Sequence, residues 1–178
     1  MLSHVVAVGD IHGQLSLLLD LAHNAEQQMR KAGLTFGRHW TFLFLGDYID
    51  RGPDSEGVVE ALIRFQSRGA ICLRGNHEQM ALDRHEAKSD GRLRVELDRA
   101  ASATARADHI AWFGSLPMFY ETESHFFVHA GVHPDIPLAQ QARDQDPQIL
   151  LWIRERFLDH QQTFEKYVVH GHTTTRQW

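Results

Sequence analysis

The segment Val5-Val6-Ala7-Val8-Gly9-Asp10-Ile11-His12-Gly13 joins a short apolar run to a polar motif bounded by glycine. The β-branched run over residues 5–8 predicts a buried strand. Residues 15–31 predict an amphipathic helix that ends at Gly33, and its apolar face is made by Leu15, Leu18, Leu19, Ala22 and Met29. This stretch therefore predicts a strand, a polar loop and a helix in succession.

The same succession occurs again further along the chain. Residues 41–45 predict a second strand, which leads into the motif Gly46-Asp47-Tyr48-Ile49-Asp50-Arg51-Gly52. A helix opens at residues 52–55 and closes at Gly69, and residues 70–73 predict a third strand. This repetition predicts an α/β fold with a largely parallel sheet, whose ligands gather at the carboxyl ends of the strands.

The second half of the chain predicts a second sheet. Residues 81–110 are rich in charged residues and alanine with little apolar periodicity, and we interpret them as a cap-like helical insertion beside the site. Residues 119–120 and 126–129 predict a hairpin, residues 149–158 a helix, and residues 167–169 the last strand. No linker separates these segments, so we expect a single domain over residues 1–178.

The composition argues against several classes of protein. With 178 residues, of which 43% are hydrophobic, the chain can bury one sizeable core. The net charge of −5 and the lack of a Lys/Arg-rich run argue against a nucleic-acid partner. No apolar run approaches the roughly 20 residues of a membrane span, no export signal precedes residue 5, and the single Cys72 suits a reducing compartment. We therefore expect a cytoplasmic protein without a membrane partner.

Five polar motifs stand at the ends of predicted strands, and their side chains suit divalent cations. They are GDIHG (9–13), GDYIDRG (46–52), GNHE (75–78), HAG (129–131) and GHT (171–173). Asp, Asn and His offer oxygen and nitrogen lone pairs at about 2.0–2.3 Å from a metal. Each motif alone is more often a helix cap or a surface turn. Because all five occur together and each contains glycine, we interpret them as one two-metal site.

This set of motifs resembles the calcineurin-like metallophosphoesterases, and within them the bacterial and phage-type serine/threonine phosphoprotein phosphatases. The resemblance covers nearly the whole chain. It implies an α/β fold of four αββα layers, a β-sandwich of mixed sheets flanked by helices. The family pattern continues with further strands beyond the position of Trp178. We therefore expect a sheet that lacks its final strands, and either a monomer of reduced stability or a weak dimer.

The resemblance also implies the metals and their ligands. In the family pattern the first metal is held by Asp10, His12 and Asp47, and the second metal is held by Asp47, Asn76, His129 and His172. Asp47 would bridge the two ions. We expect manganese at both positions, and iron and zinc are the alternatives that this ligand set accepts.

The catalytic groups follow from the same resemblance. We assign His77 as the general acid that protonates the leaving alkoxide, and Asp50 as the partner of its other ring nitrogen. Arg51 and Arg154 would clamp the phosphate, because a guanidinium binds two phosphoryl oxygens at once. Together with His77 and these arginines, Asn76 completes the substrate-binding set.

The expected substrate is a phosphomonoester, with phosphoserine or phosphothreonine on a protein ahead of a small phosphoester. Asp50 and Glu78 occupy positions at which the related diadenosine tetraphosphate hydrolases tend to carry Ala and Asp, and the Trp152-x-Arg154 segment favours the same assignment. The alternative substrate is a dinucleoside polyphosphate or a nucleotide. A second alternative is a non-catalytic metal-binding scaffold, which would have no need for both His77 and Asp50.

The remaining histidines lie outside the motifs. We interpret seven of them as surface or packing residues: His4, His23, His39, His85, His109, His125 and His160. His133 follows the HAG motif and could line a cleft. His170 shares a strand face with His172 but precedes the GHT unit. Arg156 is the alternative to Arg154 as a phosphate ligand.

Overall fold

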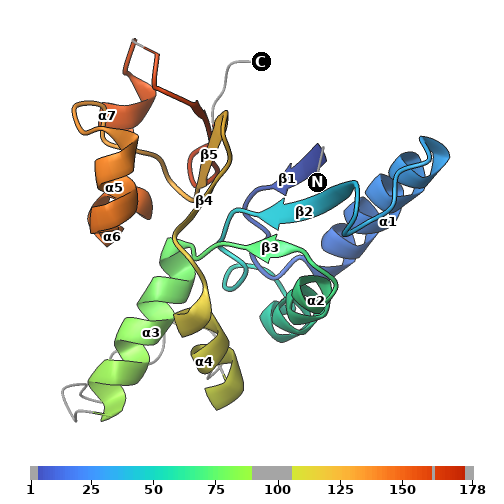
Figure 1. The fold of residues 1–178 in the computed structure, drawn as a ribbon. Helices are drawn as coiled ribbons and strands as arrows, with labels where there is room; N and C mark the ends of the chain where they lie inside the picture. Colours follow the sequence, from blue (N-terminus) through green and yellow to red (C-terminus); the bar gives the residue numbers. More distant parts are fainter. Residues whose placement is uncertain (1–3, 90–105, 162, 175–178) are drawn as a thin grey trace.

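The computed structural model describes residues 4–89, 106–161 and 163–174, which form two small sheets with helices on their outer sides (Figure 1). Each sheet has three strands. Within these residues, no helix combines the length and the apolar character needed to cross a bilayer.

The first sheet is parallel, and its middle strand is buried on both faces. It consists of β1 (His4–Val8), β2 (Trp40–Phe44) and β3 (Ile71–Cys72), with β2 in the centre. Because alternate residues of a strand point to opposite faces, Phe42 packs with the helices while Leu43 faces the second sheet. The parallel arrangement predicted from the sequence is therefore confirmed. A strand that is buried on both faces needs apolar residues at nearly every position, which explains the continuous apolar run of β2.

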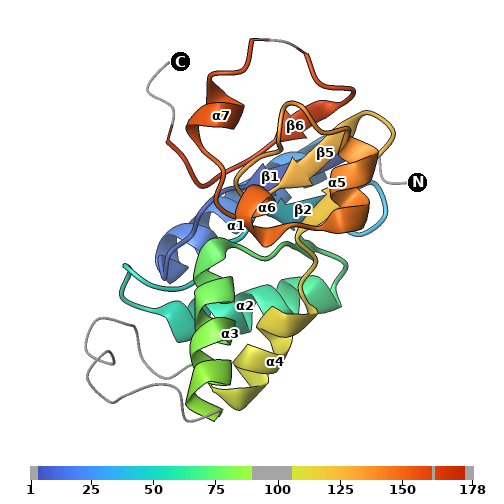
Figure 2. The same cartoon turned by 90° about the vertical axis from the view of Figure 1, so that its left-hand side faces the viewer.

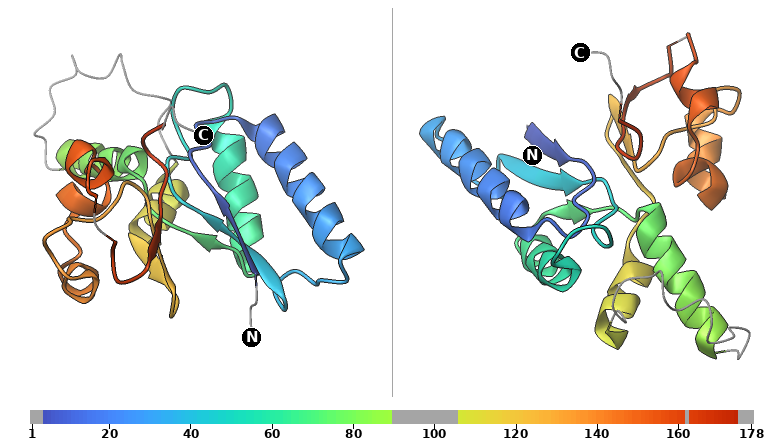
Figure 3. Two further views of the ribbon diagram at one scale, coloured as in Figure 1. Left: turned by 90° about the horizontal axis from the view of Figure 1, so that it is seen from above. Right: turned by 180° about the vertical axis from the view of Figure 1, so that it is seen from behind.

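Two helices lie side by side over the outer face of the first sheet (Figure 3). The first, α1 (Leu15–Lys31), begins and ends as predicted, and the second is α2 (Ser55–Ser67). The Asp54 side chain accepts the Gly57 N–H at 2.8 Å and so caps α2. The assignment of Leu19 to the apolar face of α1 was wrong, because this side chain is 48% exposed. It lies about 100° around the helix from the buried Leu18, at the margin of the apolar stripe.

The second sheet is mixed. In it β4 (Phe119–Glu121) pairs antiparallel with β5 (His125–Val128), and β5 pairs parallel with β6 (Tyr167–Val169). The predicted hairpin and last strand are thus confirmed. Among the strands that the structure describes, β6 lies at an edge of this sheet.

Three short helices cover the outer face of the second sheet (Figure 2): α5 (Leu138–Asp144), α6 (Pro147–Leu150) and α7 (Glu155–Leu158). Their apolar side chains pack with Phe126 of β5. The single helix predicted over residues 149–158 was wrong, because the chain turns between α6 and α7. Arg154 there has φ −132° and ψ −102°, which lie outside the helical region.

An apolar layer joins the two sheets. It contains Leu43, Leu45 and Leu73 from the first sheet and its loops, and Phe127 from β5. With the helices on either side, these sheets form the predicted four αββα layers.

A further pair of helices packs together at one end of the sheets (Figures 1 and 2). They are α3 (Asn76–Ser89) and α4 (Ala107–Ser115). They overlap the predicted insertion over residues 81–110, of which residues 90–105 lie outside the described ranges. Arg74 Nη2 donates to the carbonyl oxygens of Gly114 (2.8 Å) and Leu116 (3.1 Å), and so ties the start of α3 to the end of α4.

Candidate metal centre

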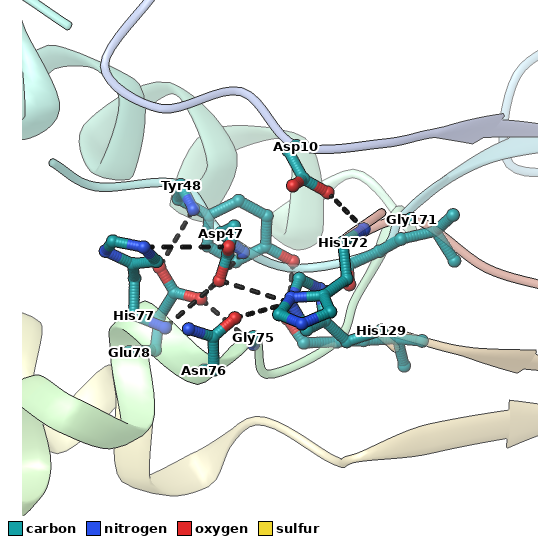
Figure 4. Close-up of polar contacts among 12 residues, drawn as sticks. Asp10, Asp47, Tyr48, Gly75, Asn76, His77, Glu78, His129, Gly171 and His172 are labelled. Carbon is teal, nitrogen blue, oxygen red and sulfur yellow. Dashed lines mark hydrogen bonds and ion pairs between the residues drawn. The ribbon is translucent and has the colours of Figure 1, made fainter. Parts of the chain in front are cut away.

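The five motifs meet at one end of the two sheets, although they lie far apart in the sequence (Figure 4). Each motif begins one to three positions after the last residue of a strand: β1, β2, β3, β5 and β6. Because parallel strands present their carboxyl ends at the same edge of a sheet, the loops converge there. The structure brings together all six residues predicted as metal ligands: Asp10, His12, Asp47, Asn76, His129 and His172.

The backbone of these loops adopts an uncommon conformation. Six non-glycine residues in the described ranges have positive φ, and five of them belong to the motifs: His12 (44°), Asp47 (55°), Asp50 (70°), Arg51 (65°) and His172 (61°). Such left-handed backbone at a non-glycine residue costs about 1–3 kcal/mol and is concentrated at functional sites. The backbone thus identifies the same region as the side chains do.

Asp47 lies at the centre of the cluster and is only 1% exposed. Its Oδ2 is 3.6 Å from His12 Nε2 and 3.9 Å from His77 Nε2, and its Oδ1 is 3.4 Å from His129 Nε2. One buried carboxylate therefore faces two separate groups of imidazoles, which is the position of a ligand shared by two metals.

His129 and His172 form the first of these groups. The Nδ1–H of His129 donates to the Leu45 carbonyl oxygen at 2.9 Å, which leaves a lone pair on Nε2. That nitrogen is 3.1 Å from His172 Nδ1, and the other ring nitrogen of His172 is buried and has no hydrogen-bond partner in the part of the chain that the structure describes. Burial is the main cause that lowers the pKa of both rings, and the pKa of His172 falls to about 4. Both imidazoles are therefore neutral at pH 7 and suited to bind a cation.

Asn76 completes this group. Its side-chain oxygen lies among acceptors: Asp47 Oδ2 at 3.2 Å, Asp47 Oδ1 at 3.3 Å, His129 Nε2 at 2.9 Å and His172 Nδ1 at 3.0 Å. Without a cation, the amide would have to turn over so that its NH₂ group donates to these atoms. With a cation in their midst, the amide oxygen is itself a ligand. A carboxylate, an amide oxygen and two imidazoles fit a borderline divalent metal.

The second group surrounds His12. The His12 Nδ1–H donates to the Ile49 carbonyl oxygen at 2.9 Å, while Nε2 is buried and has no hydrogen-bond partner among the described residues. This nitrogen is 3.6 Å from Asp47 Oδ2 and 3.8 Å from Asp10 Oδ2. The Asp10 Oδ1 accepts the His172 backbone N–H at 2.9 Å, which joins the two groups. A buried lone pair beside two carboxylates fits a second cation that shares Asp47.

His77 lies beside this centre with the partner predicted for it. Its Nδ1 is 2.6 Å from Asp50 Oδ2, and the two side chains are 12% and 16% exposed. Burial lowers the pKa of His77, but the hydrogen bond to Asp50 and the charges of Asp47 and Asp50 together outweigh it, so the pKa is raised. The other ring nitrogen is 3.3 Å from Arg51 Nη2. The ring is thus oriented by Asp50 at one nitrogen, while its other nitrogen faces an arginine whose charge lowers the pKa of the ring in part.

Of the two arginines in residues 152–156, Arg154 lies beside the cluster. Arg154 Nη1 donates to Thr173 Oγ1 at 3.2 Å, next to His172, and its charge adds to burial in lowering the pKa of that histidine. Arg156 Nη2 instead pairs with Asp135 at 2.9 Å. The geometry therefore favours Arg154 over Arg156 as a phosphate ligand.

Two further histidines, His133 and His170, have contacts with a loop and with an aromatic ring. The His133 Nδ1 accepts the Asp135 backbone N–H at 3.2 Å, and the His133 N–H donates to the Gln141 side chain at 2.7 Å. His170 packs edge-on against Phe157, with ring centroids 4.9 Å apart.

Glu78 has a place in the site that its sequence motif did not predict, since the motif served only to choose between substrates. This side chain is 0% exposed. Its Oε2 accepts the N–H groups of Asp47 and Gly75 at 2.9 Å each, and its Oε1 accepts the Tyr48 N–H at 2.8 Å. Burial and the nearby Asp47 charge raise the pKa of Glu78 to about 7, whereas the three N–H groups lower it. Its place three residues after Gly75, at the start of a helix, is typical of a capping box and could have revealed it.

Comparison with known proteins gives the family and the fold. The calcineurin-like phosphoesterase family model matches residues 3–178. Serine/threonine-protein phosphatase 1 of Salmonella typhimurium is 33% identical over 167 residues, which cover 88% of this chain and 71% of that protein. Symmetrical bis(5'-nucleosyl)-tetraphosphatase of Bordetella pertussis is 31% identical over 137 residues, which cover 74% of this chain and 45% of that protein. The chain thus spans less than half the length of this second relative.

A solved structure of a cold-active protein tyrosine phosphatase matches 98% of this chain and 67% of that chain, with a TM-score of 0.60 and 20% sequence identity. At this identity the likeness shows the fold alone, and it agrees with two sheets flanked by helices.

Proposed function

The chain belongs to the calcineurin-like phosphoesterases, and we propose that it is a two-metal phosphatase acting on phosphoserine and phosphothreonine in proteins. The observation that carries this proposal is the buried Asp47 carboxylate between two imidazole groups with unsatisfied nitrogens. Asp47 would be shared by the two cations, and the other ligands would be Asp10, His12, Asn76, His129 and His172. Manganese is the proposed metal, with iron and zinc as alternatives.

Two divalent cations bound by these residues would supply positive charge and a water whose pKa is lowered toward neutrality. The protein's own residues perform the remaining steps. Arg51 and Arg154 bind the phosphoryl oxygens, since a guanidinium matches two of them at once. Arg51 contacts His77, and the charge of Arg154 lowers the pKa of His172 in part, which supports this assignment.

His77 donates a proton from Nε2 to the leaving oxygen. The Asp50 and Asp47 charges raise its pKa, which favours the protonated ring, and the 2.6 Å contact with Asp50 fixes its orientation. The proton is needed because a serine or threonine alkoxide is a poor leaving group. A non-catalytic metal scaffold has no use for this arrangement, which favours an enzyme.

Two features support a phosphoprotein substrate. The pair Asp50 and Glu78 matches the motifs of phosphoprotein phosphatases, and the relative from Salmonella carries the name of a serine/threonine phosphatase. The relative from Bordetella favours a second candidate function, hydrolysis of dinucleoside polyphosphates.

The experiment that separates these functions compares phosphoserine and phosphothreonine peptides with diadenosine tetraphosphate, using one manganese-loaded preparation. The proposal predicts a kcat/KM for the peptides at least about tenfold above that for the dinucleotide. Faster cleavage of the dinucleotide supports the second candidate. A preparation that binds metal and releases phosphate from neither substrate supports the scaffold.

A further inference from the structure

The Glu78 carboxylate joins the loop after β2 to the loop after β3 (Figure 4). It accepts the N–H groups of Asp47 and Tyr48 from the first loop and of Gly75 from the second. Both of its oxygens are used in these bonds. Glu78 therefore faces backbone, and it does not compete with Asp47 for the imidazole groups.

These hydrogen bonds fix the backbone of Asp47 on both sides. The Asp47 N–H belongs to the peptide plane before its α-carbon, and the Tyr48 N–H belongs to the plane after it. The two torsions of Asp47 are defined by the orientation of these two planes. Asp47 has φ 55°, a left-handed conformation that persists only where the surroundings enforce it. Glu78 holds both planes with one rigid group.

The two loops that Glu78 joins approach each other closely at Gly46 and Gly75. A Cβ atom at Gly75 would lie 2.2 Å from the Asp47 nitrogen and 2.4 Å from Asp47 Oδ1. A Cβ atom at Gly46 would lie 2.6 Å from the Gly75 α-carbon. The two loops are thus in direct backbone contact, which only glycine permits.

Helix capping accounts for one of the three bonds. The bond from the Gly75 N–H is the reciprocal half of a capping box at the start of α3. The bonds from Asp47 and Tyr48 come from another loop and do nothing for the helix. We propose that Glu78 is a positioning residue that sets the direction of the shared Asp47 carboxylate toward both metals. This inference rests on the two-metal site of the proposed function.

The test is metal affinity in the folded protein, measured by calorimetric titration of chelator-treated samples with MnCl₂. Glu78→Gln keeps the size of the side chain but turns one acceptor into a donor that faces a backbone N–H. Glu86→Gln, on an exposed part of the same helix, is the matched control. We expect the affinity of Glu78→Gln for both Mn²⁺ ions to fall about 10–100-fold, with Glu86→Gln within about twofold of the wild type. A wild-type affinity of Glu78→Gln for Mn²⁺ overturns the inference. This holds even if the variant is less thermally stable, because lower stability with unchanged metal affinity is the result expected if Glu78 only caps the helix.

A second measurement needs no variant and covers the case in which Glu78→Gln does not fold. In the metal-free wild type, the amide hydrogens of Asp47, Tyr48 and Gly75 should exchange at least about 100-fold more slowly than in an unstructured chain. Exchange at the unstructured rate overturns the inference. Both readouts are independent of activity: a chain that shows the predicted affinity loss but no phosphatase activity rejects the proposed function and retains this role of Glu78.

Discussion

Replacing Asp50 by asparagine removes the charge beside His77 and leaves a side chain of nearly the same shape. The contact is 2.6 Å long and both side chains are mostly buried, so solvent screens it little. A charge-assisted hydrogen bond of this kind contributes about 1.5–3 kcal/mol to the charged ring. Since about 1.4 kcal/mol corresponds to a factor of ten, cleavage that needs the His77 proton should slow about 10–100-fold.

The assay compares kcat/KM for a phosphoserine peptide and for p-nitrophenyl phosphate. An aryl leaving group needs little protonation, so its cleavage by Asp50→Asn should stay within about threefold of the wild type. Asp50 is not among the proposed metal ligands, and metal content should therefore be unchanged. Asp20→Asn, on the exposed face of α1, is the control and should leave kcat/KM unchanged for both substrates. An equal fall on both substrates, or a loss of metal, would refute the reasoning.

Three further predictions concern the phosphate clamp, pH and the loop junction. Arg154→Lys should lower kcat/KM for a phosphopeptide about tenfold or more while Arg156→Lys changes it less than about twofold, and equal effects in steady-state assays would reject the assignment. Because burial lowers the pKa of His172 from 6.5 to about 4, the unfolded chain binds more protons between these values, and the stability due to this neutral ring is lost as pH falls through 6.5. Between pH 7 and pH 5 the free energy of unfolding of the metal-free wild type, measured by urea denaturation, should fall by about 1 kcal/mol more than that of His172→Asn. This figure allows for the partial exposure of the ring. Identical pH profiles of the two proteins would contradict the prediction. Gly46→Ala should destabilise the protein by about 1–3 kcal/mol more than Gly33→Ala. Both glycines have positive φ, but only a Cβ at Gly46 would meet the backbone of the next loop. Equal urea midpoints of the two variants would contradict the close contact.

Elements whose pattern is local could be predicted from the sequence. The periodicity of residues 15–31 is carried by the segment itself, and α1 has those bounds. The run over residues 149–158 has a similar pattern, yet the chain turns within it. Arg154 leaves the helical region there and its side chain contacts Thr173, a residue close in space and distant in sequence. Such a tertiary contact overrides local helix propensity, and the hydrophobic periodicity of the sequence does not reveal it.

In the candidate site too, some features could be predicted from the sequence and others could not. The types of the ligand residues and their glycine neighbours predicted a metal site, because ligand chemistry is a property of single side chains. The role of Glu78 was not foreseen, because it depends on where the N–H groups of Asp47 and Tyr48 point. That direction follows from the left-handed backbone of Asp47, which only the packed loops determine.

Metal content and phosphate release, measured on one preparation of the wild type and of Asp47→Asn, test the central claim most directly. We predict two Mn²⁺ ions per wild-type chain, and hydrolysis of a phosphoserine peptide that a chelator abolishes and manganese restores. Asp47→Asn should stay folded, bind fewer than two ions and lose at least about 100-fold in turnover, because it removes the ligand shared by both metals. Hydrolysis that survives complete chelation, or an Asp47→Asn variant with two bound ions and wild-type turnover, would contradict the account.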